Sequence, residues 1–203
     1  GQVDVMEAGR ARPLVRRGGT QYIPEGGAQV NTLVLVNNSG RPLILLAGEI
    51  VTGGKQDRAV GKDRIIPAHS DPVDLGVFCV EPGRWTARAG ASGGGGGGVK
   101  FDAAATPMAQ PSVRKRAMSD KDQQQVWNEV AKSRESMAAA APAASGEIAE
   151  TSSYAQAMGN EEVKRQVDSV AVPLERSYQG LVRELRARNA VGVVAAVNGE
   201  IIW

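Results

Sequence analysis

The chain of 203 residues contains one cysteine, Cys79, and one histidine, His69. A single cysteine excludes an internal disulfide framework, and so few nitrogen and sulfur ligands argue against a structural zinc site. No stretch approaches the roughly 20 apolar residues that a membrane span needs. The sequence shows no signal peptide. Two compartments remain as alternatives for the protein. One is the cytoplasm, and the other is reached by export after removal of a leader that would precede Gly1.

Excess charge of one sign is also lacking, because 24 Lys and Arg residues stand against 22 Asp and Glu residues. The basic residues are scattered, and their densest groups are 16–17 and 114–116. A nucleic-acid-binding protein usually carries a denser basic stripe. We therefore expect no nucleic-acid partner, and the residues point to no metal ion or cofactor.

The length of the chain suits one hydrophobic core, so we expect a single domain over residues 1–203. Residues 1–6 resemble a strand, and the chain ends on the apolar residues 201–203. Termini are usually polar. We therefore expect a domain that is incomplete at both ends, with an apolar C-terminal end that contacts a partner protein or a second copy.

The first part of the chain predicts a mostly antiparallel sheet. Its predicted strands are 30–36, 41–51, 59–60, 64–67 and 73–81. The turn residues 37–40 predict that the first two strands form a hairpin. The last strand is nearly continuous in apolar residues, which predicts that both of its faces are covered.

Glycine is concentrated in one place, the six consecutive glycines at 93–98. Such a run has high backbone entropy and no side chains to bury. We expect a flexible glycine-rich excursion over residues 88–118. A phosphate-binding loop would need a following Lys-Ser or Lys-Thr pair, and none is present.

Helical patterns follow the excursion. We predict a helix that begins near 121 with Ser119 or Asp120 as its cap, a short turn capped by Ser152 or Ser153, a helix from Asn160 that ends at Pro173, and an apolar stripe over 174–189. Asn198-Gly199 predicts a closing hairpin that joins or abuts the first sheet. The predicted fold is α+β: an antiparallel sheet or sandwich unit from the N-terminal half and the C-terminal hairpin, covered by about three helices.

Charged residues interrupt the apolar runs at two places. Glu49 lies inside the run 43–51, where a buried carboxylate without a partner would cost several kcal/mol. Either Glu49 faces solvent, or it orients Lys55 or Arg58 toward an anion. Gln56 can bond to donors and acceptors, and Arg58 offers a fork for phosphate or carboxylate.

The second place is the segment 79–85. Glu81 and Arg84 bracket a Pro-Gly turn and could pair across it. Trp85 suits either core packing or stacking on a ligand. Cys79 lies among apolar residues, which favours a small buried side chain over a nucleophile.

These residues form recognisable motifs. The motifs are Leu46-Ala-Gly-Glu49, Gly53-Gly-Lys-Gln-Asp-Arg58, Ile66-Pro-Ala-His-Ser70, Cys79-Val-Glu-Pro-Gly-Arg-Trp85, Gln123-Gln-Gln-Val-Trp127 and Ala190-Val-Gly-Val-Val194. They resemble the ARG and rhodanese-phosphatase-superfamily-associated protein domain, a mainly prokaryotic and poorly characterised family. We expect that the chain lacks the opening strand of that family and stops at Trp203, where the family usually continues into a further segment. Its glycine run also departs from the family pattern.

The resemblance implies a link, by genomic context, to ADP-ribose-like nucleotides, and it carries no catalytic residues. Three hypotheses follow. The first is a module that binds an ADP-ribose-like or NAD-like anion through Glu49, Lys55, Gln56, Arg58, Glu81, Arg84 and Trp85. The alternative is a structural or assembly protein whose charges pair internally. The third is a hydrolase of a nucleotide derivative with Glu49 or Glu81 as base; no paired carboxylates support it, so enzymatic activity stays open.

Overall fold

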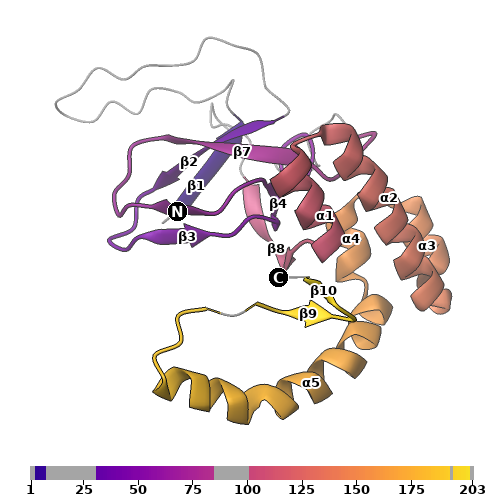
Figure 1. Cartoon of the computed structure of the whole chain (residues 1–203). Coiled ribbons are helices and arrows are strands. Elements are labelled where there is room, and N and C mark those ends of the chain that lie inside the picture. The colour runs from indigo at the N-terminus through magenta and orange to yellow at the C-terminus, as the bar shows by residue number, and fades with distance from the viewer. Residues whose placement is uncertain (1–2, 8–30, 85–100, 193, 202–203) are drawn as a thin grey trace.

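The computed structural model describes residues 3–7, 31–84, 101–192 and 194–201 (Figure 1). It shows a β-sheet body with helices packed at one side, and a long helix, α5, that runs away from this body. No helix in those ranges is both long and apolar enough to cross a membrane. The α+β prediction is confirmed.

Six antiparallel strands form the main sheet, in the order β1-β2-β7-β5-β4-β8. Their bounds are β1 Val3–Glu7, β2 Thr32–Asn37, β7 Val73–Cys79, β5 Arg58–Val60, β4 Glu49–Gly53 and β8 Phe101–Met108. Two short strands, β3 (Leu43–Leu45) and β6 (Arg64–Ile66), pair separately with each other. The strands expected near 59–60, 64–67 and 73–81 are thereby confirmed.

The predicted hairpin of 30–36 with 41–51 is wrong. Both edges of β2 are occupied by β1 and β7, so β2 has no edge left for the segment that follows it. That segment splits into β3 and β4 around Gly48, which has a φ of +89°. A Cβ at Gly48 would lie 2.9 Å from Cγ of Arg114, so only glycine allows this close approach.

Two apolar clusters lie on the sheet. One joins Leu33, Leu35, Leu75 and Val77 of the sheet to the β3–β6 pair, and the other joins Ile50, Ala59 and Val80 to the helices. The expectation that β7 is covered on both faces throughout is wrong, because Asp74 and Gly76 are exposed. Its side chains alternate, as on an antiparallel sheet with one face packed. Only Phe78, near its end, packs against the helical cluster.

The helical part of the chain begins earlier than expected, at Pro111. The bounds of the helices are α1 Pro111–Lys115, the π-helix η2 Arg116–Asp120, α2 Gln123–Ala140, the 3-10 helix η3 Pro142–Ala144, α3 Ser145–Glu150, α4 Tyr154–Gly159 and α5 Glu161–Ala187. Because η2 takes up Ser119 and Asp120, the cap of α2 is Asp122, which accepts hydrogen bonds from the backbone of Gln124 and Gln125. The predicted caps Ser153 and Asn160 are confirmed.

Helix α5 is continuous over 27 residues, so the predicted break at Pro173 is wrong. A proline inside a helix removes one backbone donor and costs roughly 3 kcal/mol. The carbonyl that loses its donor lies on an exposed helix, where solvent can bond to it instead. The amphipathic pattern continues on both sides of Pro173, and the segment therefore forms one helix.

Part of the predicted glycine-rich excursion has regular structure. Residues 101–118 contain β8, α1 and most of η2, none of which the composition predicts. Strand β8 pairs with β4 and closes one edge of the main sheet. The six glycines lie outside the described residues.

The C-terminal hairpin is confirmed but short, with β9 at Ala196–Val197 and β10 at Glu200–Ile201. Its turn residues Asn198 and Gly199 have φ angles of 50° and 82°, as a two-residue hairpin turn requires. The hairpin forms a sheet of its own. Its β10 residues border a cavity beside α1.

Candidate functional site

Asp57 is the centre of a buried polar network at one end of β5. The turn that leads to it passes through Gly53 and Gly54, whose φ angles of 128° and 53° favour glycine. One carboxylate oxygen, Oδ1, accepts from the backbone N–H of Gly53 at 3.2 Å, and Oδ2 accepts from the hydroxyl of Ser153 at 2.7 Å. The side chain of Asp57 is fully buried. The network thus joins the sheet to the helical layer.

Glu81 and Arg84 close the network from the segment after β7. Oε2 of Glu81 accepts from Nη2 of Arg84 at 2.6 Å and from the backbone N–H of Asp57 at 3.0 Å. Nη2 of Arg84 also lies 3.6 Å from Oδ1 of Asp57, and Nη1 donates to the carbonyl of Gly54. Burial lowers the pKa of Arg84, but the hydrogen bond and charge of Glu81 together with Asp57 give a net rise. Arg84 is therefore held as a cation between two carboxylates.

Gln56 and Arg58 are buried on either side of Asp57, with exposed fractions of 5% and 1%. Nε2 of Gln56 donates to the carbonyl of Glu81 at 3.2 Å, and Nη1 of Arg58 donates to the carbonyl of Asp57 at 3.4 Å. Oε1 of Gln56 finds no donor among the described residues. The two side chains contact the network and do not line the open surface.

The remaining predicted site residues are Glu49, Lys55 and Trp85. Glu49 is half-buried at the start of β4, opposite Met108 of β8. Within the described ranges, no hydrogen bond or ion pair joins it to the network. Lys55 is half-buried on the turn that precedes Asp57. Trp85 lies outside the described residues.

A side chain from α2 extends the backbone pairing of β7. Gln123 accepts from the backbone N–H of Cys79 through Oε1 and donates to its carbonyl through Nε2, both at 2.8 Å. The amide thereby satisfies both backbone groups of the last residue of β7. Burial raises the pKa of the Cys79 thiol, against smaller lowering effects that include those of the Glu81 backbone and Arg58. The prediction that Cys79 is buried is confirmed, since none of its surface is exposed.

The segment 152–154 brings the helical layer onto the network. The hydroxyl of Ser152 lies 3.4 Å from Oε1 of Glu81, and Ser153 both caps α4 and bonds to Asp57. The hydroxyl of Tyr154 accepts from the backbone N–H of Gln110 at 3.0 Å. Burial raises the pKa of Tyr154 to about 12.

Neither Asp57 nor Ser153 is among the predicted site residues. The position of Asp57 between Gln56 and Arg58 indicates its role in the network, because a buried base pairs most readily with an acid. Ser153 carried no signal beyond its role as a helix cap.

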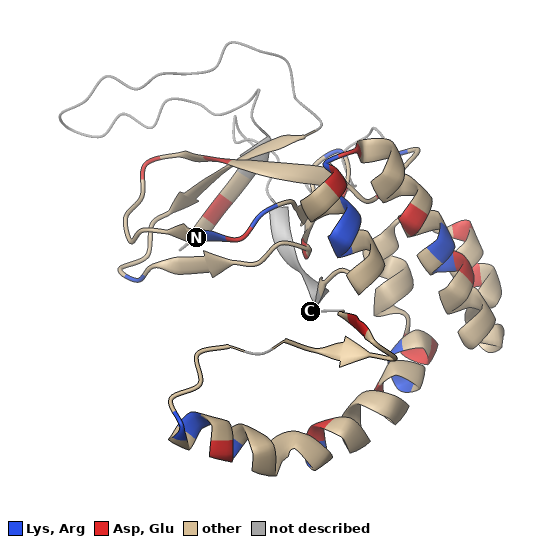
Figure 2. Cartoon of the chain, in the orientation of Figure 1, with Lys and Arg blue, Asp and Glu red and all other residues tan. Residues whose placement is uncertain are grey.

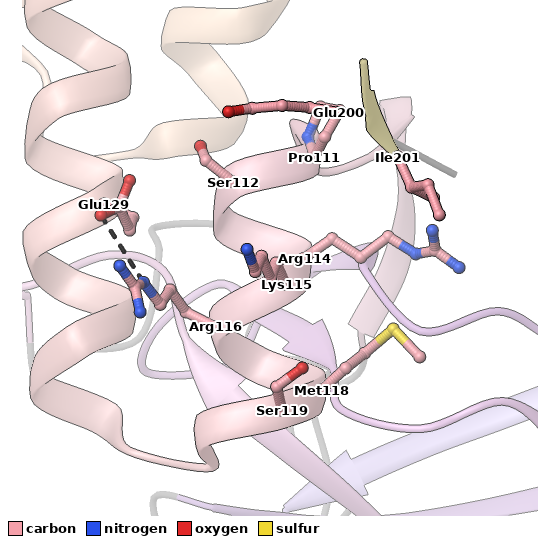
Figure 3. Close-up of a pocket in the computed structure, with 10 residues that line it drawn as sticks. All are labelled: Pro111, Ser112, Arg114, Lys115, Arg116, Met118, Ser119, Glu129, Glu200 and Ile201. Atoms are coloured by element: carbon pink, nitrogen blue, oxygen red, sulfur yellow. Dashed lines mark ion pairs between the residues drawn. The ribbon is translucent and has the colours of Figure 1, made fainter. Parts of the chain in front are cut away.

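A separate cavity of about 510 Å³ lies between α1, η2, α2 and the C-terminal hairpin (Figure 3). It is bordered by Pro111, Ser112, Arg114, Lys115, Arg116, Met118, Ser119, Glu129, Glu200 and Ile201. Nε of Arg114 donates to the carbonyl of Ala47, and Arg116 pairs with Asp120 and Glu129. None of the predicted site residues borders this cavity. The described ranges hold no group of three His, Cys, Asp or Glu side chains placed to bind a metal ion.

A family model decides the relationship of the chain to known proteins. The model for the ARG and Rhodanese-Phosphatase-superfamily-associated Protein domain matches residues 2–203. The chain belongs to this family. Searches of curated proteins and of solved structures each found no match.

In this ARPP-1 domain, the two central motifs meet in space. Strand β5 pairs with β7, and Arg58 lies opposite Cys79. The segments 53–58 and 79–84 therefore share one end of the sheet. The hydrogen bonds and ion pairs at this end run mostly between the motif residues themselves.

Proposed function

We propose that this domain is an assembly module, in which the buried network holds the body together and α5 docks onto a protein partner. The observation that carries the proposal is the apolar stripe that α5 exposes. Its exposed members, with their exposed fractions, are Val167 57%, Val170 61%, Leu174 50%, Tyr178 54% and Leu181 45%. A contiguous exposed apolar patch of this kind marks an interaction surface.

The stripe follows the helical period, so its members share one face. At 100° per residue they fall within about 80° around the helix. The opposite face carries Arg165, Gln179 and Arg183. Only Val163, in the first turn, is buried in the body. A helix with such a face is stable in water when another surface covers that face.

The network supports the same proposal. Asp57 and Glu81 accept hydrogen bonds from the backbone, from Ser153 and from Arg84. Removing one partner of a buried ion pair costs about 3–5 kcal/mol, because the other charge is left without compensation. We infer that the motif residues stabilise the fold on which α5 is mounted.

Position-specific photo-cross-linking in the native host cell tests the docking role of α5. A photo-reactive phenylalanine analogue replaces Tyr178 on the stripe, and in a matched control it replaces the neighbouring Gln179 on the opposite face. We expect a protein adduct from position 178 and at least ten-fold less from position 179. Equal adduct yields at the two positions, or none at either, would contradict the proposal.

A second candidate function is the binding of a small anion such as ADP-ribose or NAD. The cavity beside α1 favours it, because about 510 Å³ lies within the usual range for ligand pockets and three cations border it. Lys115 has no ion-pair partner within the described ranges. Among the residues first predicted, Arg58 and Glu81 are bonded within the network and Lys55 lies on the adjoining turn.

Titration calorimetry with ADP-ribose and with NAD tests this second candidate. We expect Lys115→Glu to weaken binding at least ten-fold, because it places a carboxylate beside the anion. Lys132→Glu, at an exposed position on α2 outside the cavity lining, is the matched control and should leave affinity unchanged. The absence of heat at millimolar ligand would rule the candidate out.

A further inference from the structure

We propose that the partner of α5 is a second copy of this chain, and that the two α5 helices pair antiparallel about a twofold axis at Leu174. This inference rests on the proposed docking role of α5. A twofold interface requires one surface that is complementary to itself. The stripe on α5 meets that requirement in its spacing and in its side-chain sizes.

The spacing of the stripe is symmetric about Leu174. Val170 and Tyr178 lie four residues before and after it, and Val167 and Leu181 lie seven residues before and after it. In an antiparallel pair centred on Leu174, every stripe residue of one copy therefore meets a stripe residue of the other. The pattern has the same spacing in both directions along the chain.

The sizes of the side chains favour the antiparallel orientation. The residues before Leu174 are valines, and the residues after it are Tyr178 and Leu181. Antiparallel pairing places Val170 against Tyr178 and Val167 against Leu181, so each layer combines a small side chain with a large one. Parallel pairing would give narrow layers at one end and wide layers at the other. Uniform layers let two helices pack along their length at one spacing.

The charged residues of α5 lie away from the stripe. Glu161 in the first turn and Arg186 in the last turn fall about 140° and 120° around the helix from the centre of the stripe, so pairing through the stripe leaves them in solvent. Figure 2 shows charged residues near both ends of α5 and near its middle.

The pairing has a defined extent. Val163 is buried in the body, so the free stripe runs from Val167 to Leu181, about 22 Å at 1.5 Å per residue. A stable interface usually covers about 800 Å² on each partner, more than a helix stripe of this length alone supplies. The segment after α5 exposes further apolar side chains, at Val191, Val194, Val197 and Ile201. These residues extend the apolar surface beyond the helix.

Sedimentation velocity on the full chain tests for the second copy. We expect a dimer of twice 21.3 kDa that dissociates on dilution. Leu174→Glu places two carboxylates together at the axis and should weaken the dimer at least 100-fold. Gln179→Glu, on the opposite face, should leave it unchanged. Because Leu174 is half exposed, both variants should keep the thermal unfolding midpoint of the body, which checks that they fold.

Disulfide cross-linking tests the orientation. In an antiparallel pair, a mixture of Val167→Cys and Leu181→Cys chains forms a mixed disulfide, whereas Val167→Cys alone does not, because its two copies lie about 21 Å apart along the axis. Parallel pairing gives the opposite result. The wild-type chain is the control, since Cys79 is fully buried and should form no cross-link.

The possible outcomes separate pairing with a second copy from the docking role of α5. A dimer with the mixed disulfide supports the inference. A monomer at about 200 µM, which sets the dissociation constant above that value, overturns it, as does a disulfide from Val167→Cys alone. An adduct to a different protein from position 178, with a monomeric chain, would overturn the second copy and leave the docking role of α5 standing.

Discussion

At the scale of single residues, the Asp57 side chain links three separate parts of the chain. Its carboxylate receives the backbone of Gly53 and the hydroxyl of Ser153, and it lies beside Arg84. The sequence singles out residues 53–58 and 79–84 as polar segments, and the pairing of β5 with β7 brings them together. The sequence did not show Ser153, which lies 96 residues from Asp57 and has no local pattern that points to it.

Asp57→Ala should lower the free energy of unfolding by about 3–5 kcal/mol, because it leaves the other buried partners of the network without compensation. Urea denaturation followed by tryptophan fluorescence measures the loss. Asp71→Ala removes an exposed carboxylate and is expected to change stability by less than about 0.5 kcal/mol. Equal effects of the two substitutions would show that the network contributes no more to the free energy of unfolding than an exposed carboxylate does.

Tyr154 predicts a loss of stability in alkali. Its pKa rises from 10.0 to about 12 in the folded chain, so the folded state favours the protonated phenol. The corresponding stabilisation is fully present below pH 10 and is lost as the pH rises from 10 toward 12, a change of roughly 2–3 kcal/mol. Unfolding free energies measured across that range should show the loss. Tyr154→Phe should remove this part of the slope and Tyr178→Phe should keep it; identical slopes in the two variants would contradict the assignment.

At the scale of elements, regular patterns predicted most of the strands and helices, and the failures have separate causes. Apolar runs predicted β2 and β7, and helical spacing predicted α2. Strand β8 was missed because its alanines have low strand propensity and follow a glycine run. The break expected at Pro173 did not occur, since local propensity is only one term in the stability of α5. The pairing of β2 could not be predicted, because β1 and β7 occupy its two edges and neither is its neighbour in the chain.

One amide hydrogen-bonds α2 to the end of β7. Gln123→Ala should lower the free energy of unfolding by about 2 kcal/mol, because both backbone groups of Cys79 lose their partner. Gln125→Ala, two residues along on an exposed position, should be close to neutral. Thermal or urea unfolding of both variants measures these changes in the free energy of unfolding. A neutral Gln123→Ala would mean that solvent replaces the amide without cost.

At the scale of the whole molecule, the body and α5 differ in what covers their apolar side chains. Most apolar side chains of the body are buried, whereas α5 exposes its stripe from Val167 to Leu181. In our proposal, a second copy covers that stripe. Amide hydrogen exchange should show this difference directly. At low micromolar concentration we expect residues 167–181 to exchange much faster than α2, and their protection should rise with protein concentration while that of α2 stays constant. Strong protection of α5 that does not depend on concentration would contradict the dependence on a second copy.

The hydrogen bond from Ser153 to Asp57 also bears on the order in which the chain folds. The two residues are separated by 96 positions, so closing this contact carries a large loop-closure entropy. During synthesis, the segments that carry Asp57 and Glu81 emerge long before α4. The Asp57 carboxylate remains without the Ser153 hydroxyl until the helical half has been made. The sheet can therefore reach its final stability only late in translation, and contacts at such separation favour slow folding.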